Sequence, residues 1–321
     1  MVDEFVKEIT SELEAKESRG RARSGDAQDN FEYAVQFILE NLWRKSLSFP
    51  PSESFIHLRS GYYSELPRYK DTKLTYRQVK AAFEGMIECR FIEITSKGNH
   101  FKELLTGFVA TDQLLERLEN LEGHPAFVLS PDPDEETIIL RNKIDGHKVD
   151  VDYADTPKTE RFRSNLKKIN QCFMKHWADL RIKDTEVQRL AERILQDQDK
   201  EPIDLTRRTL TRIFANGSFD EGGRLYRGWW QNVPSEYRPF ITIDEAVTTE
   251  YDYSQLSPHM LYFAYNYEMG NEDAYDRVLD GQHRDVVKQA FNAMVQAKSP
   301  LNLKPKKINM DGMERPKAEN T

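Results

Sequence analysis

A change of hydrophobic period within one short stretch constrains the fold of this chain more than any other feature of its sequence. Over residues 76–89 the apolar residues recur at helical spacing, and Thr75 followed three positions later by Gln78 has the pattern of a capping box. The expected buried stripe of this helix is formed by Val79, Ala82, Phe83, Met86 and Ile87. A strand pattern follows at once at residues 91–94, and a second apolar run begins at residue 104 after a polar turn. The stretch therefore predicts a helix, a strand, a turn and a second strand.

This order of elements is that of a winged helix. A preceding helix is predicted with Asp29 as its N-cap, and a following helix with Thr111 as its cap. Residues 56–102 carry nine Lys and Arg against five Asp and Glu, so this segment is basic inside an acidic chain. Arg77 and Lys80 lie on the exposed face of the candidate recognition helix, where phosphate or base-edge contacts are made. The alternative is a solvated helix face in a winged helix that binds protein.

Composition excludes several classes of protein. The chain has 46 Lys and Arg against 54 Asp and Glu, a net charge of −8, which excludes a uniformly basic nucleic-acid coat protein. No apolar run approaches the roughly 18 to 20 residues of a membrane helix, and the first residues lack a signal pattern. We therefore expect a cytoplasmic protein that does not contact a membrane. Cys89 and Cys172 are too few for a disulfide framework, and both are expected as buried free thiols on helices.

The stretch 216–265 contains most of the residues that suggest chemistry. Gly222 and Gly223 indicate a tight turn that presents Arg224. A hairpin is predicted over residues 238–252, with its turn at residues 244–245. Asp252 thus ends a strand just ahead of a helix that opens at Ser257 and Pro258, a common position for a metal-binding carboxylate. An ordinary surface Asp is the alternative.

Three ordered motifs in this stretch resemble a known family. The sequences GRL at residues 223–225, QNVP at 231–234 and DYSQL at 252–256 look like the template-contacting segment and motif A of family A DNA polymerases, whose palm is shared with single-subunit phage-type RNA polymerases. The resemblance covers residues 205–297. It implies that Asp252, with the backbone of Tyr253, binds two divalent metals, Mg²⁺ or Mn²⁺. It also implies that Arg224, Gln231 and Asn232 contact a primer-template.

The nucleotide-binding residues of the family are matched in part. Arg284 and Lys288 have the spacing of the motif B helix that holds the incoming triphosphate, although an ordinary amphipathic helix with two solvated cations has the same spacing. Ser257 stands where the family has Glu, and His259 where it has Arg. The smaller Ser257 suggests relaxed discrimination against ribonucleotides. No His-Asp pair, the family's second metal carboxylate, follows Asp252. Either a second protein chain supplies that carboxylate, or the chain is a shortened relative.

We therefore expect an α+β protein with a winged-helix-like domain, a helical region and a partial polymerase-like palm. The expected segments are a flexible amino-terminal extension at residues 1–27, the winged-helix-like domain at 28–150, the helical region with the partial palm at 151–297, and a basic flexible tail at 298–321. Three functions remain open. The chain is a DNA- or RNA-binding protein with weak or no synthesis on its own, an active nucleotidyltransferase completed by a partner chain, or a non-enzymatic regulator of replication or transcription.

Overall fold

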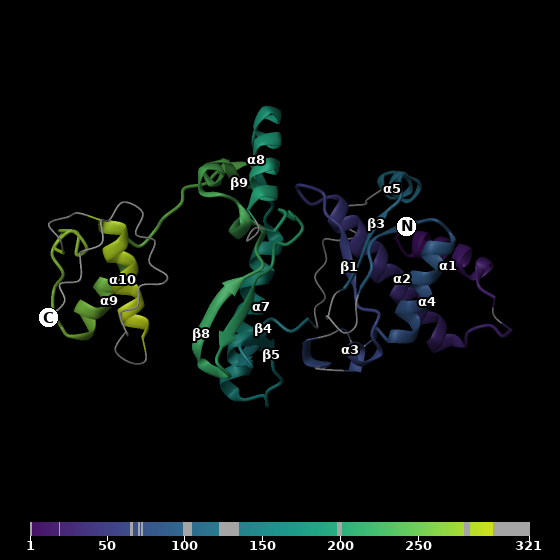
Figure 1. Cartoon of the computed structure of the whole chain (residues 1–321), viewed down its shortest axis with the longest axis horizontal. Coiled ribbons are helices and arrows are strands. Elements are labelled where there is room, and N and C mark those ends of the chain that lie inside the picture. The colour runs from purple at the N-terminus through teal and green to yellow at the C-terminus, as the bar shows by residue number, and fades with distance from the viewer. Residues whose placement is uncertain are drawn as a thin grey trace, which may run out of the picture. The chain divides into compact units, whose positions relative to one another are not determined.

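The computed structural model is an α+β protein with three small sheets (Figure 1). It describes residues 2–18, 20–64, 67–69, 71, 73–98, 105–121, 135–197, 201–278 and 283–297. The expected tail at residues 298–321 lies outside this set. Contacts divide the chain into two compact units, Met1–Thr249 and Glu250–Thr321. Among the described helices, none has both the length and the apolar character needed to cross a bilayer.

The first part of unit 1 is a helical body around a three-stranded antiparallel sheet of order β1-β3-β2. Its elements are α1 (Val2–Lys16), α2 (Gly25–Ser46), β1 (Ser54–Ile56), α3 (Ser60–Ser64), η1 (Pro67–Tyr69), α4 (Tyr76–Glu88), β2 (Ile92–Ser96), β3 (Thr106–Ala110) and α5 (Asp112–Glu119). The predicted helix at residues 76–89 and both predicted strands are therefore confirmed. Four of the five expected stripe residues of α4 are buried, and Ile87 is exposed. The capping box is absent, because Thr75 makes no side-chain cap bond.

The expected flexible extension at residues 1–27 is wrong. Helix α1 buries Phe5, Val6, Ile9 and Leu13 in the same core as α2 and α4. Arg23, which follows α1, is also anchored, since it pairs with Glu14 at 2.7 Å and with Glu17 at 2.6 Å. The Arg23 guanidinium also lies 3.5 Å from the ring centroid of Phe31 at the start of α2. Apolar burial and these ion pairs hold the segment in place.

The second part of unit 1 contains a four-stranded sheet of order β5-β4-β7-β8, with α7 packed against β4 (Figure 1). Strand β4 runs parallel to β7, and the other neighbours are antiparallel. The elements are β4 (Ile138–Ile144), β5 (His147–Asp150), α7 (Pro157–Lys175), β6 (Ala178–Leu180), α8 (Asp184–Gln196), β7 (Thr211–Ala215), β8 (Ser218–Tyr226), η3 (Trp229–Asn232), η4 (Ser235–Phe240), β9 (Ile241–Ile243) and β10 (Ala246–Val247). Strands β10, β9 and β6 form a third, antiparallel sheet.

Several element starts differ from those predicted. Helix α2 begins at Gly25 with Ser24 as its N-cap, about one turn before Asp29. The helical spacing of the apolar residues suggests Thr159 as the cap of α7, but the cap is Thr156, whose side chain accepts a hydrogen bond from the Thr159 amide. The predicted strand at residues 247–252 ends at Val247, because the chain beyond it pairs with no neighbour in the described sheets. Cys172 is exposed and Cys89 is half-buried, so the expectation of two buried thiols is also wrong.

The turn Pro67–Tyr69 of the helical body is fastened to the second part of unit 1. Arg68 pairs with Asp152 at 2.8 Å and with Asp155 at 3.2 Å. The Tyr69 hydroxyl donates to the carbonyl of Val151 at 2.7 Å and accepts from the Leu140 amide at 3.1 Å. Both parts of unit 1 are therefore joined by charge-assisted and neutral hydrogen bonds. We refer to this set of contacts as the Arg68 joint.

Unit 2 is small and built around two described helices, α9 (Leu256–Ala264) and α10 (Arg284–Gln296). Helix α9 starts after Gln255, which adopts the left-handed conformation with φ of 54°, rather than at the predicted Ser257. The side chain of Gln255 accepts a hydrogen bond from the Ala274 amide. Tyr275 is buried and packs edge-to-face on Phe291 of α10, with ring centroids 5.7 Å apart.

Candidate nucleic-acid interface

Helix α4 presents two of the predicted nucleic-acid contacts to solvent. Arg77 and Lys80 are exposed, while Val79 and Ala82 of the same turns are fully buried. The Arg77 guanidinium has no hydrogen-bond or ion-pair partner recorded in the part of the chain that the structure describes. Lys80 forms an ion pair of 3.6 Å with Glu84, one turn along the same exposed face. The exposed face of α4 therefore combines two cations with one partly neutralising carboxylate.

The opposite side of α4 is held rigidly. Phe83 packs edge-to-face on Phe108 of β3, with ring centroids 5.1 Å apart. Gly85 faces α1 so closely that an added Cβ would lie 3.3 Å from the Cβ of Leu13. The Cys89 thiol donates to the Glu12 carbonyl at 3.6 Å, and burial raises the pKa of this thiol. The core and α1 thus fix the orientation in which α4 displays Arg77 and Lys80.

Not every cation of the basic segment is available for a ligand. Arg68, counted in the net charge of residues 56–102, is held in the Arg68 joint by Asp152, Asp155 and Glu136. Glu136 also binds Arg163 at 2.9 Å. The hydrogen bond from Arg68 lowers the pKa of Asp152, and hydrogen bonds chiefly from Arg163 lower the pKa of Asp155. Arg68 therefore stabilises the contact between the two parts of unit 1 and is not available to bind a ligand.

Arg224 lies in strand β8, and the two glycines before it form a bulge in that strand rather than the predicted tight turn. Gly222 and Gly223 have φ of 77° and 76°, and the register of β8 on β7 shifts beside them. An added Cβ on Gly223 would lie 2.9 Å from the Phe214 ring. The hairpin turn between β7 and β8 is formed instead by Asn216 and Gly217, both at positive φ. Arg224 is exposed.

Gln231 and Asn232 lie in the 3₁₀ helix η3, close to the end of β8. The Gln231 amide group donates to the Leu225 carbonyl at 2.9 Å, and its oxygen accepts from the Gly228 amide at 3.2 Å. Both ends of this side chain therefore close the turn, which is a structural role. Asn232 is half-buried next to Val233, a member of the fully buried core that includes Trp229.

Asp252 and Tyr253 lie in an irregular, exposed segment of unit 2. Throughout the described residues, no three His, Cys, Asp or Glu side chains gather closely enough to hold a metal ion. A site for Mg²⁺ or Mn²⁺ requires several oxygen ligands around one position. Asp252 by itself does not meet this requirement, so the described residues of this chain do not on their own fit the metal site that the sequence resemblance implies.

The expected triphosphate contacts lie on the two helices of unit 2. The Arg284 guanidinium binds one carboxylate oxygen of Asp273 through Nε at 2.9 Å and Nη2 at 2.6 Å, and its pKa is raised by this bond. Lys288, one turn later, is exposed, as is His259 of α9, and Ser257 is half-buried. The described structure thus places Arg284 in an internal ion pair and leaves Lys288 at the surface.

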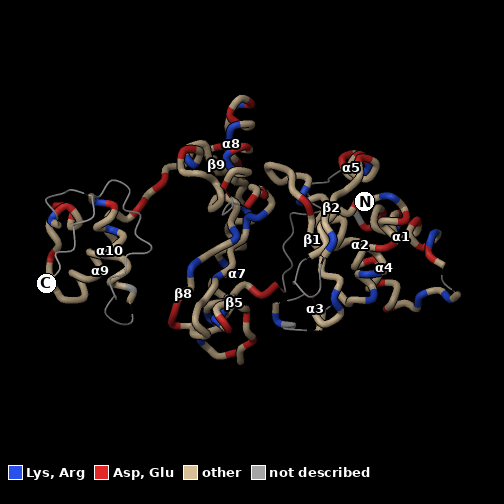
Figure 2. The backbone as a smooth tube through the Cα atoms, in the orientation of Figure 1, with Lys and Arg blue, Asp and Glu red and all other residues tan. Residues whose placement is uncertain are grey.

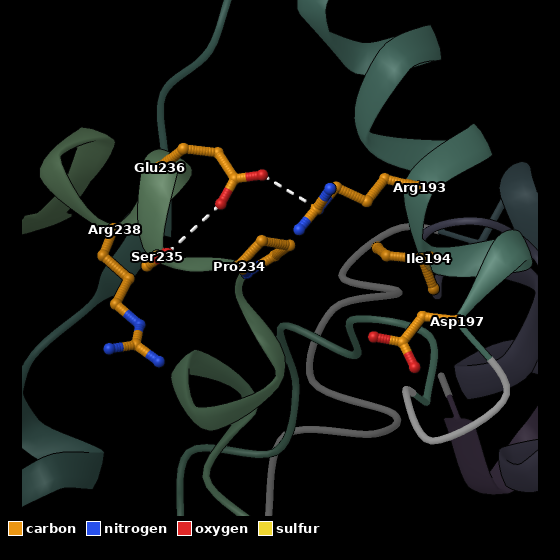
Figure 3. Close-up of a pocket in the computed structure, with 7 residues that line it drawn as sticks. All are labelled: Arg193, Ile194, Asp197, Pro234, Ser235, Glu236 and Arg238. Carbon is orange, nitrogen blue, oxygen red and sulfur yellow. Dashed lines mark hydrogen bonds and ion pairs between the residues drawn. The ribbon is translucent and has the colours of Figure 1, made fainter. Parts of the chain in front are cut away.

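A polar pocket lies between the end of α8 and η4 (Figure 3). It is lined by Arg193, Ile194, Asp197, Pro234, Ser235, Glu236 and Arg238. Arg193 pairs with Glu236 at 2.8 Å, and Arg238 donates to the Val233 carbonyl at 3.2 Å. The two cations and two carboxylates of the lining balance each other, so the pocket has no charge preference for an anionic or a cationic ligand.

Unit 2 also exposes a large amount of apolar surface. The described residues at least 70% exposed there include Tyr251, Tyr253, Phe263, Tyr265 and Tyr267. Surfaces of this kind are typical of interaction sites. No family model matches the chain, and neither a curated protein nor a solved structure matches it.

Proposed function

We propose that this protein binds duplex DNA through a winged-helix-like body in which α4 is the recognition helix. The order α2, β1, α3, α4, β2, β3, with an antiparallel β1-β3-β2 sheet, supports this proposal. The observation that carries it is the outward placement of Arg77 and Lys80 on α4, a helix fixed from behind by the core. A recognition helix of this type enters the major groove, where cations neutralise phosphates and reach base edges.

Binding is proposed in preference to nucleotidyl transfer. The palm-like motifs support a polymerase ancestry by sequence, but the chemistry has less support from the arrangement of side chains. Gln231 is engaged in its own turn, and Arg284 is paired with Asp273. Template-dependent incorporation in a primer-extension assay with Mg²⁺ or Mn²⁺, abolished by Asp252→Ala, would reverse this preference.

The first test removes both cations from α4. The double variant Arg77→Ala/Lys80→Ala is expected to bind a labelled duplex at least tenfold more weakly than the unchanged chain, in fluorescence anisotropy titrations. The slope of log K against log salt should flatten by about 2, because each lost phosphate contact removes roughly 0.9. Arg161→Ala/Lys168→Ala, on the exposed side of α7, is the matched control with the same loss of charge. Equal affinities of the two double variants would refute the proposal.

The ion pair on α4 provides a test of opposite sign. Glu84→Gln releases Lys80 from its carboxylate partner and removes a negative charge from the proposed DNA-facing side. Duplex affinity should rise, by roughly two- to fivefold, since an exposed pair at this distance is worth about 1 kcal/mol or less. A protein-binding helix face would show no gain of affinity for DNA in the same titration.

A further inference from the structure

The strand register gives the four-stranded sheet two different faces. On one face Arg212 and Phe214 of β7 lie with Phe162 of α7, since the Arg212 guanidinium is 4.4 Å from the Phe162 ring centroid. Side chains alternate along a strand, so Ile213 points to the opposite face. Ile213 is paired with Ile139 of β4 and with Arg224 of β8, which places Arg224 on that opposite face as well. Ile139 and Thr211 on this face are buried, whereas Arg224 is exposed. We call the exposed part of this face the open face of the sheet.

The β4–β5 hairpin contributes further cations to the open face. Two residues beyond Ile139, Arg141 is paired in register with Asp150 of β5 and forms an ion pair of 2.7 Å with it. Two residues further, Lys143 is paired with Lys148. Both lysine side chains are exposed, and within the described residues neither forms an ion pair with a carboxylate. Like charges placed directly opposite each other are unfavourable in a sheet, so an external anion bound between these two lysines would stabilise the pair.

Arg224 and Tyr226 extend the same surface across the sheet. Tyr226 of β8 is paired with Thr211 and therefore shares the face of Arg224, and both side chains are exposed. The bulge at Gly222 and Gly223 determines that Arg224 and Tyr226 lie on this face, because it shifts the register just before Arg224. In Figure 2 the Lys and Arg positions appear in blue near the β5 and β8 labels. From Lys143 to Arg224 the surface extends roughly 13 Å along the strands and 10 Å across them.

We propose that the open face binds single-stranded nucleic acid, with Lys143, Lys148 and Arg224 on the phosphates and Tyr226 stacked on a base. Charge complementarity supports this occupant, since the residues that the described strand register places on this face include four cations, Arg141, Lys143, Lys148 and Arg224, and one carboxylate, Asp150, which is paired with Arg141. The diagonal of this surface, roughly 16 Å, is long enough for a few phosphates of one extended strand. Exposed aromatic side chains within a basic sheet surface are the usual platform for unpaired bases. The surface shares no residue with α4, so this proposal does not depend on the proposed function.

The test measures binding of a fluorescein-labelled oligothymidylate of about 15 nucleotides, long enough for a site of this size. The triple variant Lys143→Ala/Lys148→Ala/Arg224→Ala should bind at least tenfold more weakly, with a salt slope flatter by about 2. Tyr226→Ala should weaken binding by roughly tenfold with no change of salt slope, because stacking releases no counterions. Circular dichroism and thermal melting confirm that each variant is folded.

A matched control loses the same charge from the other side of the sheet. Arg161, Lys168 and Lys175 form one exposed stripe on α7, which covers the opposite face, and their triple Ala variant should bind the oligonucleotide as the unchanged chain does. Equal weakening by the two triple variants would reduce the effect to net charge and overturn the proposal. Arg77→Ala/Lys80→Ala should leave oligothymidylate binding unchanged. Loss of that binding through α4 alone would likewise overturn it.

Discussion

At the scale of single residues, Gly222 and Gly223 restrict substitution both through their backbone conformation and through their close packing. Both have φ near 76°, a conformation that residues with a Cβ rarely adopt. Each also faces another part of the hairpin closely, and the Gly223 carbonyl accepts a hydrogen bond from Arg212 at 2.9 Å. The pair was visible in the sequence, but its role was not, because a Gly-Gly pair indicates a turn and a bulge equally well.

Gly223→Ala should therefore destabilise the chain by about 1–3 kcal/mol, the cost of a strained backbone plus a close contact with Phe214. Urea unfolding measures the change in the free energy of unfolding. Two other glycines, each replaced by Ala, separate backbone strain from the close contact. Gly146 has φ of 87° with open space around it, and Gly20 has open space and no positive φ. We expect losses in the order Gly223, Gly146, Gly20. A Gly223→Ala chain as stable as Gly20→Ala would contradict the bulge.

At the scale of elements, local sequence patterns predicted where helices and strands lie better than they predicted which faces of those elements are buried. The period of Val79, Ala82, Phe83 and Met86 located α4, since the spacing of apolar residues depends only on the helix itself. Helix α1 also has a regular apolar stripe, but its many charged residues suggested a flexible extension. Whether such a stripe is buried depends on partners distant in sequence, here α2 and α4, which no local pattern specifies.

The burial of α1 can be tested at Leu13, which is 1% exposed and packs on Gly85. Leu13→Ala should lower the free energy of unfolding by about 2–4 kcal/mol, the cost of removing a buried Leu side chain. Leu195 on α8, 71% exposed, is the matched control, and its replacement by Ala should change stability by less than about 0.5 kcal/mol. Similar values for the two variants would restore the expectation of a flexible amino-terminal extension.

At the scale of the whole molecule, the Arg68 joint connects residues that no sequence pattern pairs. Arg68 and Asp155 are 87 positions apart in the chain, and Glu136, just before β4, and Arg163 of α7 join them. Prediction of the candidate site from sequence was limited in the same way. Arg77, Lys80 and Arg224 could be selected from sequence, whereas Lys143 and Lys148 gained meaning only when the register placed them together on the open face.

The joint should make stability depend on acid pH. Burial opposes ionisation of Glu136, but hydrogen bonds from Arg163 outweigh it and the pKa is lowered, as are the pKa values of Asp152 and Asp155. Carboxylates with lowered pKa values stabilise the fold at neutral pH, and this contribution is lost as pH falls below about 4. Glu136→Gln/Asp155→Asn should therefore destabilise the chain by about 1–3 kcal/mol at pH 7 and by much less at pH 3. Urea unfolding at both pH values gives the comparison, and an equal loss at each would exclude the joint as its source.

The Tyr69 hydroxyl has a consequence for experiments that follow this joint in time. It accepts the hydrogen bond of the Leu140 amide, a donor in the middle of β4. Exchange of that one amide proton with deuterated solvent therefore requires the Pro67–Tyr69 turn to move away, whereas neighbouring β4 amides bonded within the sheet require strand separation. The protection of the Leu140 amide against exchange, relative to that of its neighbours, thus reports how often the helical body separates from the sheet. The measurement needs no label on either part.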